Sequence, residues 1–135
     1  MPEPLIDVAR YYNGGLSWPQ FLASAANNAD RMRAFYDAFE FDEETLSFFN
    51  GRTPLQVLAI AEDWCPDSAY SIPYVARLAQ SAGIPLRIVG REAGEPLMRA
   101  HPTRDGRSVT PTVVMLRNGR DVGAWVERPA ELQQM

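Results

Sequence analysis

The stretch AEDWCPDSAYSIPY at residues 61–74 holds the pattern that decides the fold. A short apolar run, LQVLAIA at 55–61, leads into it and is typical of a buried strand. A helical pattern follows from about Cys65 to Ala82, and Pro73 inside it is expected to kink the helix. The chain's one cysteine, Cys65, therefore lies where a strand ends and a helix begins.

The rest of the chain continues this alternation of strands and helices. Leu86–Val89 is a second strand pattern, Gly94–Ala100 a short helix and Thr112–Leu116 a third strand. The turn Asn118-Gly119 predicts a hairpin with a returning strand at Val122–Val126. A strand–helix–strand unit predicts parallel pairing with a right-handed crossover, and the hairpin adds an antiparallel edge. The sequence therefore predicts an α/β fold with a central mixed sheet of about four strands flanked by helices.

The region before the first strand has helical patterns only. The segment SWPQ at 17–20 has the residues of a helix start, with a serine cap and a proline in the first turn. Asp30 and Asp42 are placed to begin two further helices. We therefore divide the chain into an N-terminal helical extension, residues 1–53, and a strand-containing domain, residues 54–135, that form one structural unit.

Composition narrows the classes of protein to which the chain can belong. Its 135 residues give room for one domain with one core. A net charge of -4 does not favour nucleic acid or an anionic membrane as a partner, and no apolar run approaches the roughly 20 residues of a membrane helix. A single cysteine excludes an internal disulfide, so a reducing, cytoplasmic location is expected. With one histidine and one cysteine, no metal site and no other cofactor are expected.

The place of Cys65 at a helix start has a chemical consequence. The first N–H groups of a helix have no partner within it, and partial positive charge gathers there. A thiolate is stabilised at such a place, with a pKa of roughly 3.5–7.5 instead of about 8.5. Trp64 would flank the sulfur with an apolar surface. Ser68, one turn further, is either a donor of a hydrogen bond to the thiolate or a serine of the helix face with no such role.

These residues resemble a known family. The assembly Trp64-Cys65-Pro66-Asp67-Ser68, with Pro73 in the following helix, resembles the W-C-x-x-C motif of the thioredoxin-like superfamily. Thr110-Pro111-Thr112 is similar to the family's proline segment, which implies a cis bond at Pro111 beside the reactive cysteine. The resemblance covers roughly residues 54–127 and is closest to a bacterial WCGD- or WCPD-type subfamily in which a helical region precedes the domain. It implies that residues 54–135 are a thioredoxin-like domain.

Three departures from the family pattern bear on activity. Ser68 replaces the second cysteine, so one chain cannot resolve a mixed disulfide by itself. Ala59 stands where thioredoxins carry a buried acid that assists proton transfer. Thioredoxins close with a full helix, whereas only ten residues follow Trp125 here. We expect the N-terminal helices, or the second copy in a homodimer, to cover the sheet face that this helix would cover.

The resemblance implies a monothiol thiol–disulfide oxidoreductase. Cys65, as a thiolate, would attack a disulfide of a protein or a small molecule, and an external low-molecular-weight thiol would resolve the mixed disulfide. The backbone of Thr110, beside Pro111, would pair with the bound substrate, and Pro66 and Asp67 complete the predicted substrate-binding set. Asp67 has a second interpretation as an acid that complements the helix dipole.

Other functions stay open at this point. A non-catalytic peptide-binding module would use the same groove around Trp64, Thr110 and Pro111, with the cysteine incidental. A monothiol glutaredoxin-like site would hold an iron–sulfur cluster with glutathione across a dimer. A peroxidase is disfavoured because related peroxidatic sites have Thr or Ser three residues before the cysteine, where Glu62 stands.

The remaining charged residues near the site have plainer interpretations. Glu62 and Asp63 are expected to be solvated, with a role for one of them as proton acceptor as the alternative. His101 is interpreted as a loop or helix-capping residue. Arg104 and Arg107 are interpreted as solvated loop residues, with binding of an acidic peptide or a small carboxylate thiol as the alternative.

Overall fold

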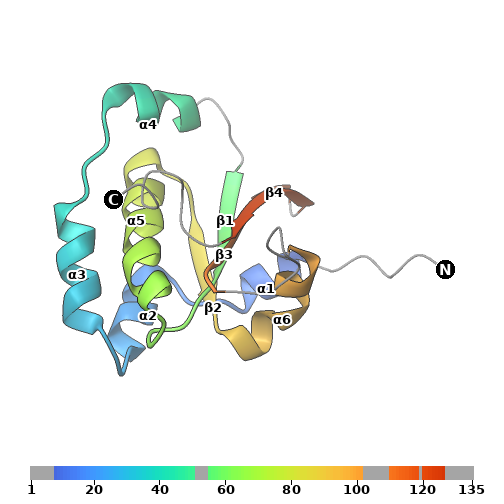
Figure 1. Ribbon diagram of the computed structural model, residues 1–135. Helices are drawn as coiled ribbons and strands as arrows, with labels where there is room; N and C mark the ends of the chain where they lie inside the picture. The colour runs from blue at the N-terminus through green and yellow to red at the C-terminus, as the bar shows by residue number, and fades with distance from the viewer. Residues whose placement is uncertain (1–7, 51–54, 102–109, 119, 127–135) are drawn as a thin grey trace.

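A computed structural model describes residues 8–50, 55–101, 110–118 and 120–126 (Figure 1). Within them the elements are, in chain order, α1 (Val8–Asn13), α2 (Trp18–Ser24), α3 (Ala29–Ala38), α4 (Glu43–Asn50), β1 (Leu55–Ile60), α5 (Pro66–Ala82), β2 (Leu86–Val89), α6 (Arg91–Ala100), β3 (Thr112–Arg117) and β4 (Arg120–Val126).

The four strands form one mixed sheet with the order β2-β1-β3-β4. β1 pairs with β2 in parallel, as in Ala59 opposite Ile88, and α5 connects the two strands. β1 also pairs antiparallel with β3, and β3 pairs antiparallel with β4 through the hairpin. The predicted α/β fold with a mixed sheet of about four strands flanked by helices is therefore confirmed.

Helix α5 has clear start and stop residues. Cys65 is its N-cap, and Pro66 takes the first helical position, where a missing N–H removes no helical hydrogen bond. Gly83 ends the helix in the left-handed conformation with φ of 72°, which glycine adopts at little cost. The helix runs on through Pro73, which is fully buried, and the expected kink there stays a prediction.

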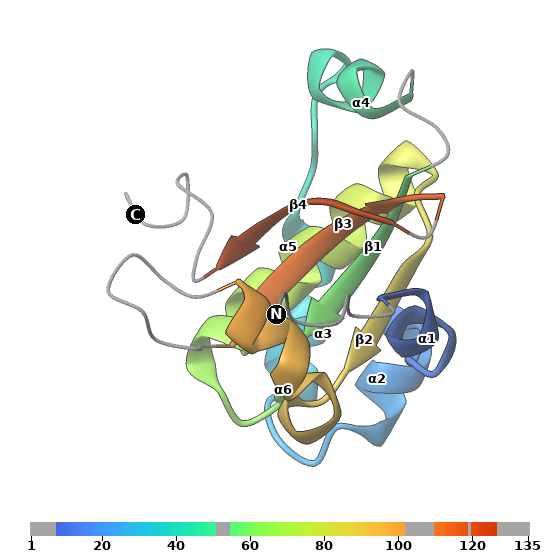
Figure 2. The same cartoon turned by 90° about the vertical axis from the view of Figure 1, so that its right-hand side faces the viewer.

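Side chains of β1 alternate between two cores, one on each face of the sheet. Val57 and Ala59 point into the core under α5, and Leu58 and Ile60 point into the core under α6. Figure 1 shows α3 and α5 on one side of the sheet and α1 and α6 on the other. Figure 2 looks onto the sheet, with α6 in front of it and α5 behind it. Both faces of β1 are thus buried, which explains its nearly continuous apolar sequence.

The N-terminal helices contribute to both cores. Met32 of α3 and Phe21 of α2 are buried in the core under α5, and Val8 and Tyr12 of α1 are buried in the opposite one. The expectation that the N-terminal helices cover a face of the sheet therefore agrees with their packing. α1 itself was not predicted, because it has six residues and no residue pattern that marks its start.

The structure confirms one of the two predicted helix starts and contradicts the other. Asp42 accepts a hydrogen bond from the Thr45 N–H at 2.8 Å and begins α4 as predicted. The start predicted at Asp30 is wrong, because Asn28 is the N-cap of α3 and Asp30 lies in the first turn. Asn28 has a left-handed backbone with φ of 61°, which the sequence pattern does not reveal.

Aromatic rings join α3 to α5. The rings of Phe35 and Tyr70 meet edge to face with 4.6 Å between their centroids, and those of Phe39 and Tyr74 do so at 5.3 Å. Such pairs add roughly 0.5–1.5 kcal/mol beyond the area that they bury. The N-terminal helix α3 is therefore bound along the length of the helix that begins at Cys65.

Backbone hydrogen bonds join the segment between α1 and α2 to the edge of the sheet. The Leu16 N–H donates to the Ile88 carbonyl at 2.8 Å, and the Ile88 N–H donates to the Leu16 carbonyl at 2.7 Å. This single bridge places Leu16 beside β2 as a short continuation of the sheet. The division between an extension and a domain at residues 53 and 54 stays a prediction, because residues 51–54 lie outside the described ranges.

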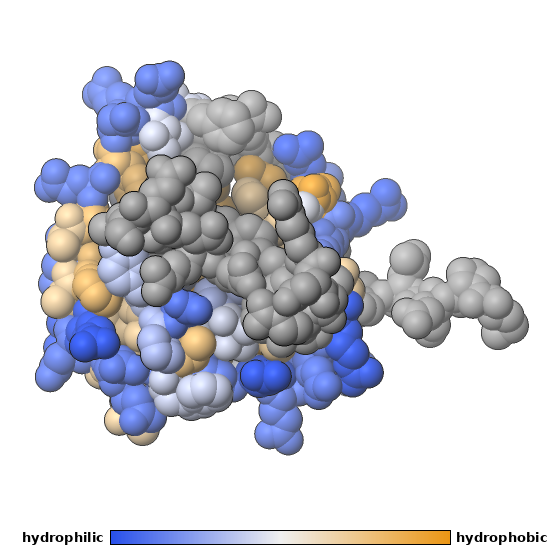
Figure 3. All heavy atoms as spheres, in the orientation of Figure 1, coloured by the Kyte–Doolittle hydropathy of each residue, from blue (hydrophilic) through white to orange (hydrophobic). Residues whose placement is uncertain are grey.

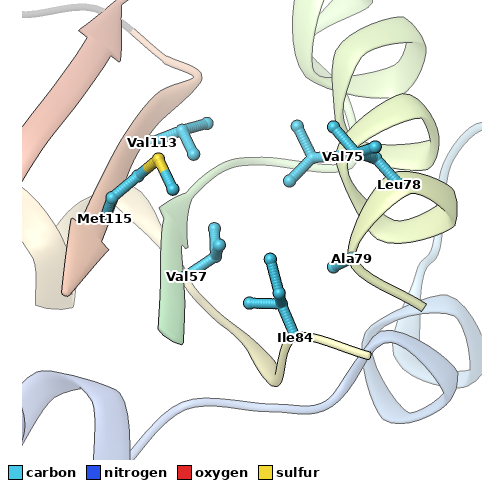
Figure 4. A pocket seen from close by; sticks show the side chains of 7 residues that line it. All are labelled: Val57, Val75, Leu78, Ala79, Ile84, Val113 and Met115. Atoms are coloured by element: carbon cyan, nitrogen blue, oxygen red, sulfur yellow. The ribbon is translucent and has the colours of Figure 1, made fainter. Parts of the chain in front are cut away.

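On the side seen in Figure 3, the described surface carries hydrophilic side chains with groups of hydrophobic ones between them. A small hollow of about 50 Å³ lies between the sheet and α5 (Figure 4). Its lining is entirely apolar and consists of Val57, Val75, Leu78, Ala79, Ile84, Val113 and Met115.

No helix in the described ranges is both long enough and apolar enough to span a membrane.

Truncation of Met32 tests how far the N-terminal helices support the core. Met32 is fully buried, so we expect Met32→Ala to lower the free energy of unfolding by about 2–5 kcal/mol. The exposed neighbour Arg33 gives a matched control, for which Arg33→Ala is expected to change it by less than about 0.5 kcal/mol. Urea denaturation measures both. Equal stabilities for the two variants would contradict this view of α3.

A second test concerns the close approach of α6 to β1. A Cβ added at Gly94 would lie 2.6 Å from Cγ1 of Ile60, which is fully buried. Alanine favours a helix by about 1 kcal/mol over glycine, but the clash costs about 1–3 kcal/mol, so we expect Gly94→Ala to be destabilising. Gly123→Ala is the control, since nothing lies within 4 Å of its added Cβ. A stabilising effect of Gly94→Ala in thermal unfolding would contradict the packing.

Candidate active site

Cys65 is held from both sides at the junction of the β1 loop and α5. Its N–H donates to the Glu62 carbonyl at 3.3 Å, and its own carbonyl accepts the Ala69 N–H at 2.9 Å. The first bond closes a turn before the helix, and the second is the first bond of the helix itself. The thiol therefore sits at the N-terminus of a helix of 17 residues, as predicted.

The segment before β3 reaches the same place from the other side. The peptide bond between Thr110 and Pro111 is cis, and both residues are buried. The Cys65 Sγ lies 3.7 Å from the Thr110 carbonyl oxygen, to which the thiol donates. The Cys65 thiol and the Thr110 carbonyl, which are 45 positions apart in the sequence, are thus in contact.

Ser68 lies one turn into α5 and is almost fully buried. Its hydroxyl oxygen accepts the Glu62 N–H at 3.3 Å, which leaves the O–H free to serve another acceptor. A hydrogen bond from the Ser68 side chain is among the causes that lower the pKa of the Cys65 thiol. Ser68 therefore links the loop before the cysteine to the sulfur.

Two opposing effects act on the pKa of the Cys65 thiol. Partial burial of the sulfur raises the pKa, because it removes water from the thiolate. Hydrogen bonds from the Thr110 side chain, from the N–H and hydroxyl of Ser68 and from the Asp67 N–H lower it. The hydrogen bonds outweigh burial, so the pKa of Cys65 lies below that of an ordinary cysteine. The site therefore favours the nucleophilic form of the sulfur.

The other predicted site residues differ in how far they are exposed. Trp64 is 57% exposed, which is high for a tryptophan, and it presents an apolar ring to solvent next to the sulfur. Pro66 is exposed, and Asp67 is half-buried in the first turn of α5. Ala59, where the family carries an acid, is fully buried among apolar side chains of the core under α5.

Glu62 and Asp63 are partly exposed, and both carboxylates also accept backbone hydrogen bonds that were not predicted. The Glu62 Oε1 atom accepts the Arg91 N–H at 2.7 Å, at the first residue of α6. The Asp63 carboxylate accepts the Ala26 N–H at 2.7 Å, from the turn between α2 and α3. Both partners lie far away in the sequence, so no local pattern could have indicated them.

His101 ends α6, in keeping with its interpretation as a capping residue. Its Nε2 atom lies 2.5 Å from Oδ2 of Asp121, which joins the end of α6 to β4. Arg104 and Arg107 lie outside the described residues. In the described part of the chain, no three His, Cys, Asp or Glu side chains gather as a metal ion would require.

Comparison with known proteins agrees with this geometry. A protein-family model described as thioredoxin matches residues 15–135. No curated protein matches the sequence.

Solved structures show the same architecture. A protein of unknown function from Pseudomonas aeruginosa has a TM-score of 0.75 and 19% identity, over 96% of this chain and 82% of that one. An HIV epitope scaffold has a TM-score of 0.73 and 19% identity over the same shares, 96% and 82%. A thioredoxin from Nicotiana alata is 16% identical over 68% of this chain and 78% of its own, with a TM-score of 0.46. At these identities the first two show a shared fold alone.

The Ser68 hydroxyl gives the sharpest test of the thiol environment. Because the pKa of Cys65 is lowered, its alkylation by iodoacetamide should reach half-maximal rate at a lower pH than that of a free cysteine. Ser68→Ala removes a donor to the thiolate, so the midpoint should rise. The rate below the midpoint should fall about three- to tenfold, less than for a fully buried charged hydrogen bond because the sulfur is partly exposed. An unchanged pH profile would show that the hydroxyl does not act on the sulfur.

Proposed function

The chain belongs to the thioredoxin family, and from this premise we propose that it is a thiol–disulfide oxidoreductase that works with one cysteine. The observation that carries the proposal is the place of the Cys65 sulfur. It lies at the N-terminus of α5 and beside Thr110, with its pKa lowered by hydrogen bonds. A sulfur so placed forms the nucleophilic thiolate more readily than an ordinary cysteine.

The reaction is thiol–disulfide exchange in two steps. The Cys65 thiolate attacks one sulfur of a substrate disulfide, a new disulfide forms to that sulfur, and the other substrate sulfur leaves as a thiolate. The thiolate of an external low-molecular-weight thiol then attacks the substrate sulfur of this mixed disulfide. Cys65 leaves as a thiolate again, and the substrate carries the external thiol in a new disulfide. A second external thiol completes reduction of the substrate and leaves the external thiol as its own disulfide.

Ser68 explains why the second step needs an external thiol. It occupies the position of the second cysteine, and a hydroxyl cannot displace a sulfur from the mixed disulfide. Its hydroxyl supports the departing Cys65 thiolate instead, which makes Cys65 a better leaving group when the external thiol attacks. This division of roles fits a WCPD-type sequence that retains the first cysteine alone.

Substrate contacts are proposed for the exposed residues next to Cys65 in the chain and for the buried pair Thr110 and Pro111. Trp64 offers an apolar ring, and Pro66 and Asp67 lie at the exposed start of α5. Thr110 and Pro111 border the sulfur on the other side, where the Thr110 backbone is proposed to pair with an extended substrate. The partner is a protein or a small molecule that carries a disulfide, in a reducing compartment such as the cytoplasm. A homodimer stays a prediction.

Exposure to oxidised glutathione tests the proposed chemistry directly. We expect one glutathione to attach to the protein at Cys65, and a reducing thiol to release it. Cys65→Ser should take up none and should lose all turnover of a small disulfide with glutathione as reductant. Intact-protein mass spectrometry and a turnover assay measure the two effects. A cysteine that stays unmodified while the protein still binds peptides would favour a non-catalytic binding module instead.

A further inference from the structure

The turn between α2 and α3 is bonded to the loop that presents Cys65. The Asp63 Oδ2 atom accepts the Ala26 N–H at 2.7 Å and the Asn27 N–H at 3.3 Å. The Oδ1 atom accepts the Asn27 side-chain amide at 3.3 Å. The Asn28 side-chain amide donates to the Asp63 backbone carbonyl at 2.8 Å. We call these contacts, between Asp63 and residues 26–28, the Asp63 clamp.

The clamp acts on the part of the site that has no regular structure. Residues 61–65 lie between β1 and α5 and make neither strand nor helix bonds along most of their length. Asp63 is two residues before Cys65 and directly before Trp64. A carboxylate that accepts several N–H groups forms hydrogen bonds about twice as strong as neutral ones. The clamp is therefore the contact that attaches this loop to the N-terminal helices.

The geometry of Asn28 indicates that the turn is shaped toward the loop. Asn28 is the N-cap of α3, yet its side chain makes no capping hydrogen bond to that helix. Its amide bonds to Asp63 instead. Its backbone is left-handed, with φ of 61°, a conformation that asparagine tolerates better than most residues. The residue thus gives up a helix cap, worth about 1 kcal/mol, and bonds to the cysteine loop.

We propose that Asp63 is a positioning residue, which holds the Cys65 sulfur over the first N–H groups of α5 and beside Thr110. The inference rests on the proposed function, because it assigns to the N-terminal helices a part in the reactivity of that thiol. Asp63 acts through the loop and does not touch the substrate. The helical N-terminal region is thereby part of the active site, in addition to its role in the core.

Charge and position make opposite predictions for Asp63→Asn. The carboxylate is negative, so by charge alone its removal would stabilise a thiolate nearby and lower the pKa of Cys65. A weaker clamp loosens the loop, weakens the hydrogen bonds to the sulfur and raises that pKa. The asparagine side chain keeps the shape of aspartate but puts an N–H donor group where one carboxylate oxygen accepts from Ala26 or Asn27. The clamp then keeps one side-chain acceptor and the Asn28 bond to the backbone carbonyl, and is weakened.

The experiment measures alkylation of Cys65 against pH in the full chain. We expect Asp63→Asn to raise the midpoint and to lower the thiolate fraction about threefold at pH values below it. Asp37→Asn is the matched control, because it removes one negative charge from an exposed position of α3 away from the loop. That variant should leave the profile unchanged.

A second variant keeps the test valid if Asp63→Asn folds poorly. Asn28→Gly removes the bond to the Asp63 carbonyl, and glycine keeps the left-handed backbone without strain. We expect a change in the same direction and about half as large on a logarithmic scale. Asn27→Ala removes a single side-chain bond to Oδ1, and a smaller change in the same direction is expected. Thermal unfolding of each variant is measured in parallel.

The outcomes separate the two proposals. If Asp63→Asn and Asn28→Gly lower the unfolding temperature but leave the alkylation profile as in the unsubstituted chain, the clamp is structural and the positioning role is overturned. A lowered midpoint in Asp63→Asn overturns it too. If the unsubstituted chain has a lowered midpoint but turns over no disulfide, the proposed function fails while the profiles still decide the role of Asp63. A free-cysteine profile in the unsubstituted chain would overturn both.

Discussion

The first backbone N–H groups of α5 have no acceptor within the helix, and those of Asp67 and Ser68 lower the pKa of the Cys65 thiol at the N-cap. The neighbouring elements place the Cys65 sulfur at this helix start. β1 brings the chain to the carboxyl edge of the sheet, and Pro66 starts the helix directly after the cysteine. Thr110 reaches the sulfur from the start of β3, so the same hydrogen-bonding environment closes from two sides. The sheet order makes this possible, because β1 and β3 are neighbours.

A serine at the position of the family's second cysteine leaves the site with one sulfur. Ser68 keeps a hydrogen-bond donor where the family has a sulfur, and its burial prevents water from taking that hydrogen bond. Ala59 removes a carboxylate from the interior, and with it a charge that would be costly to bury. The site therefore has one thiol with several hydrogen-bond donors beside it, and the proposed exchange with an external thiol rests on this arrangement.

Much of the fold could be predicted from local patterns. The bounds of α5, β2 and β3 follow from short signals such as Pro66, Gly83 and the apolar runs between them, and they agree with the structure within one or two residues. The place of Cys65 at a helix start followed from the same signals. Contacts between distant segments could not be predicted, because nothing near Asp63 in the sequence points to residues 26–28. The pair of His101 and Asp121 was missed for the same reason.

The bridge between Leu16 and Ile88 bears on whether other copies of the protein can pair with the open edge of the sheet. An outer strand with open N–H and C=O groups is a template on which a neighbouring chain can add a strand, and such additions grow into aggregates. Here Leu16 of the N-terminal segment pairs with Ile88 at the edge of β2, through backbone hydrogen bonds of 2.7 and 2.8 Å. A neighbour that docks along β2 must first displace Leu16. The segment before α2 thus covers part of the open edge of β2.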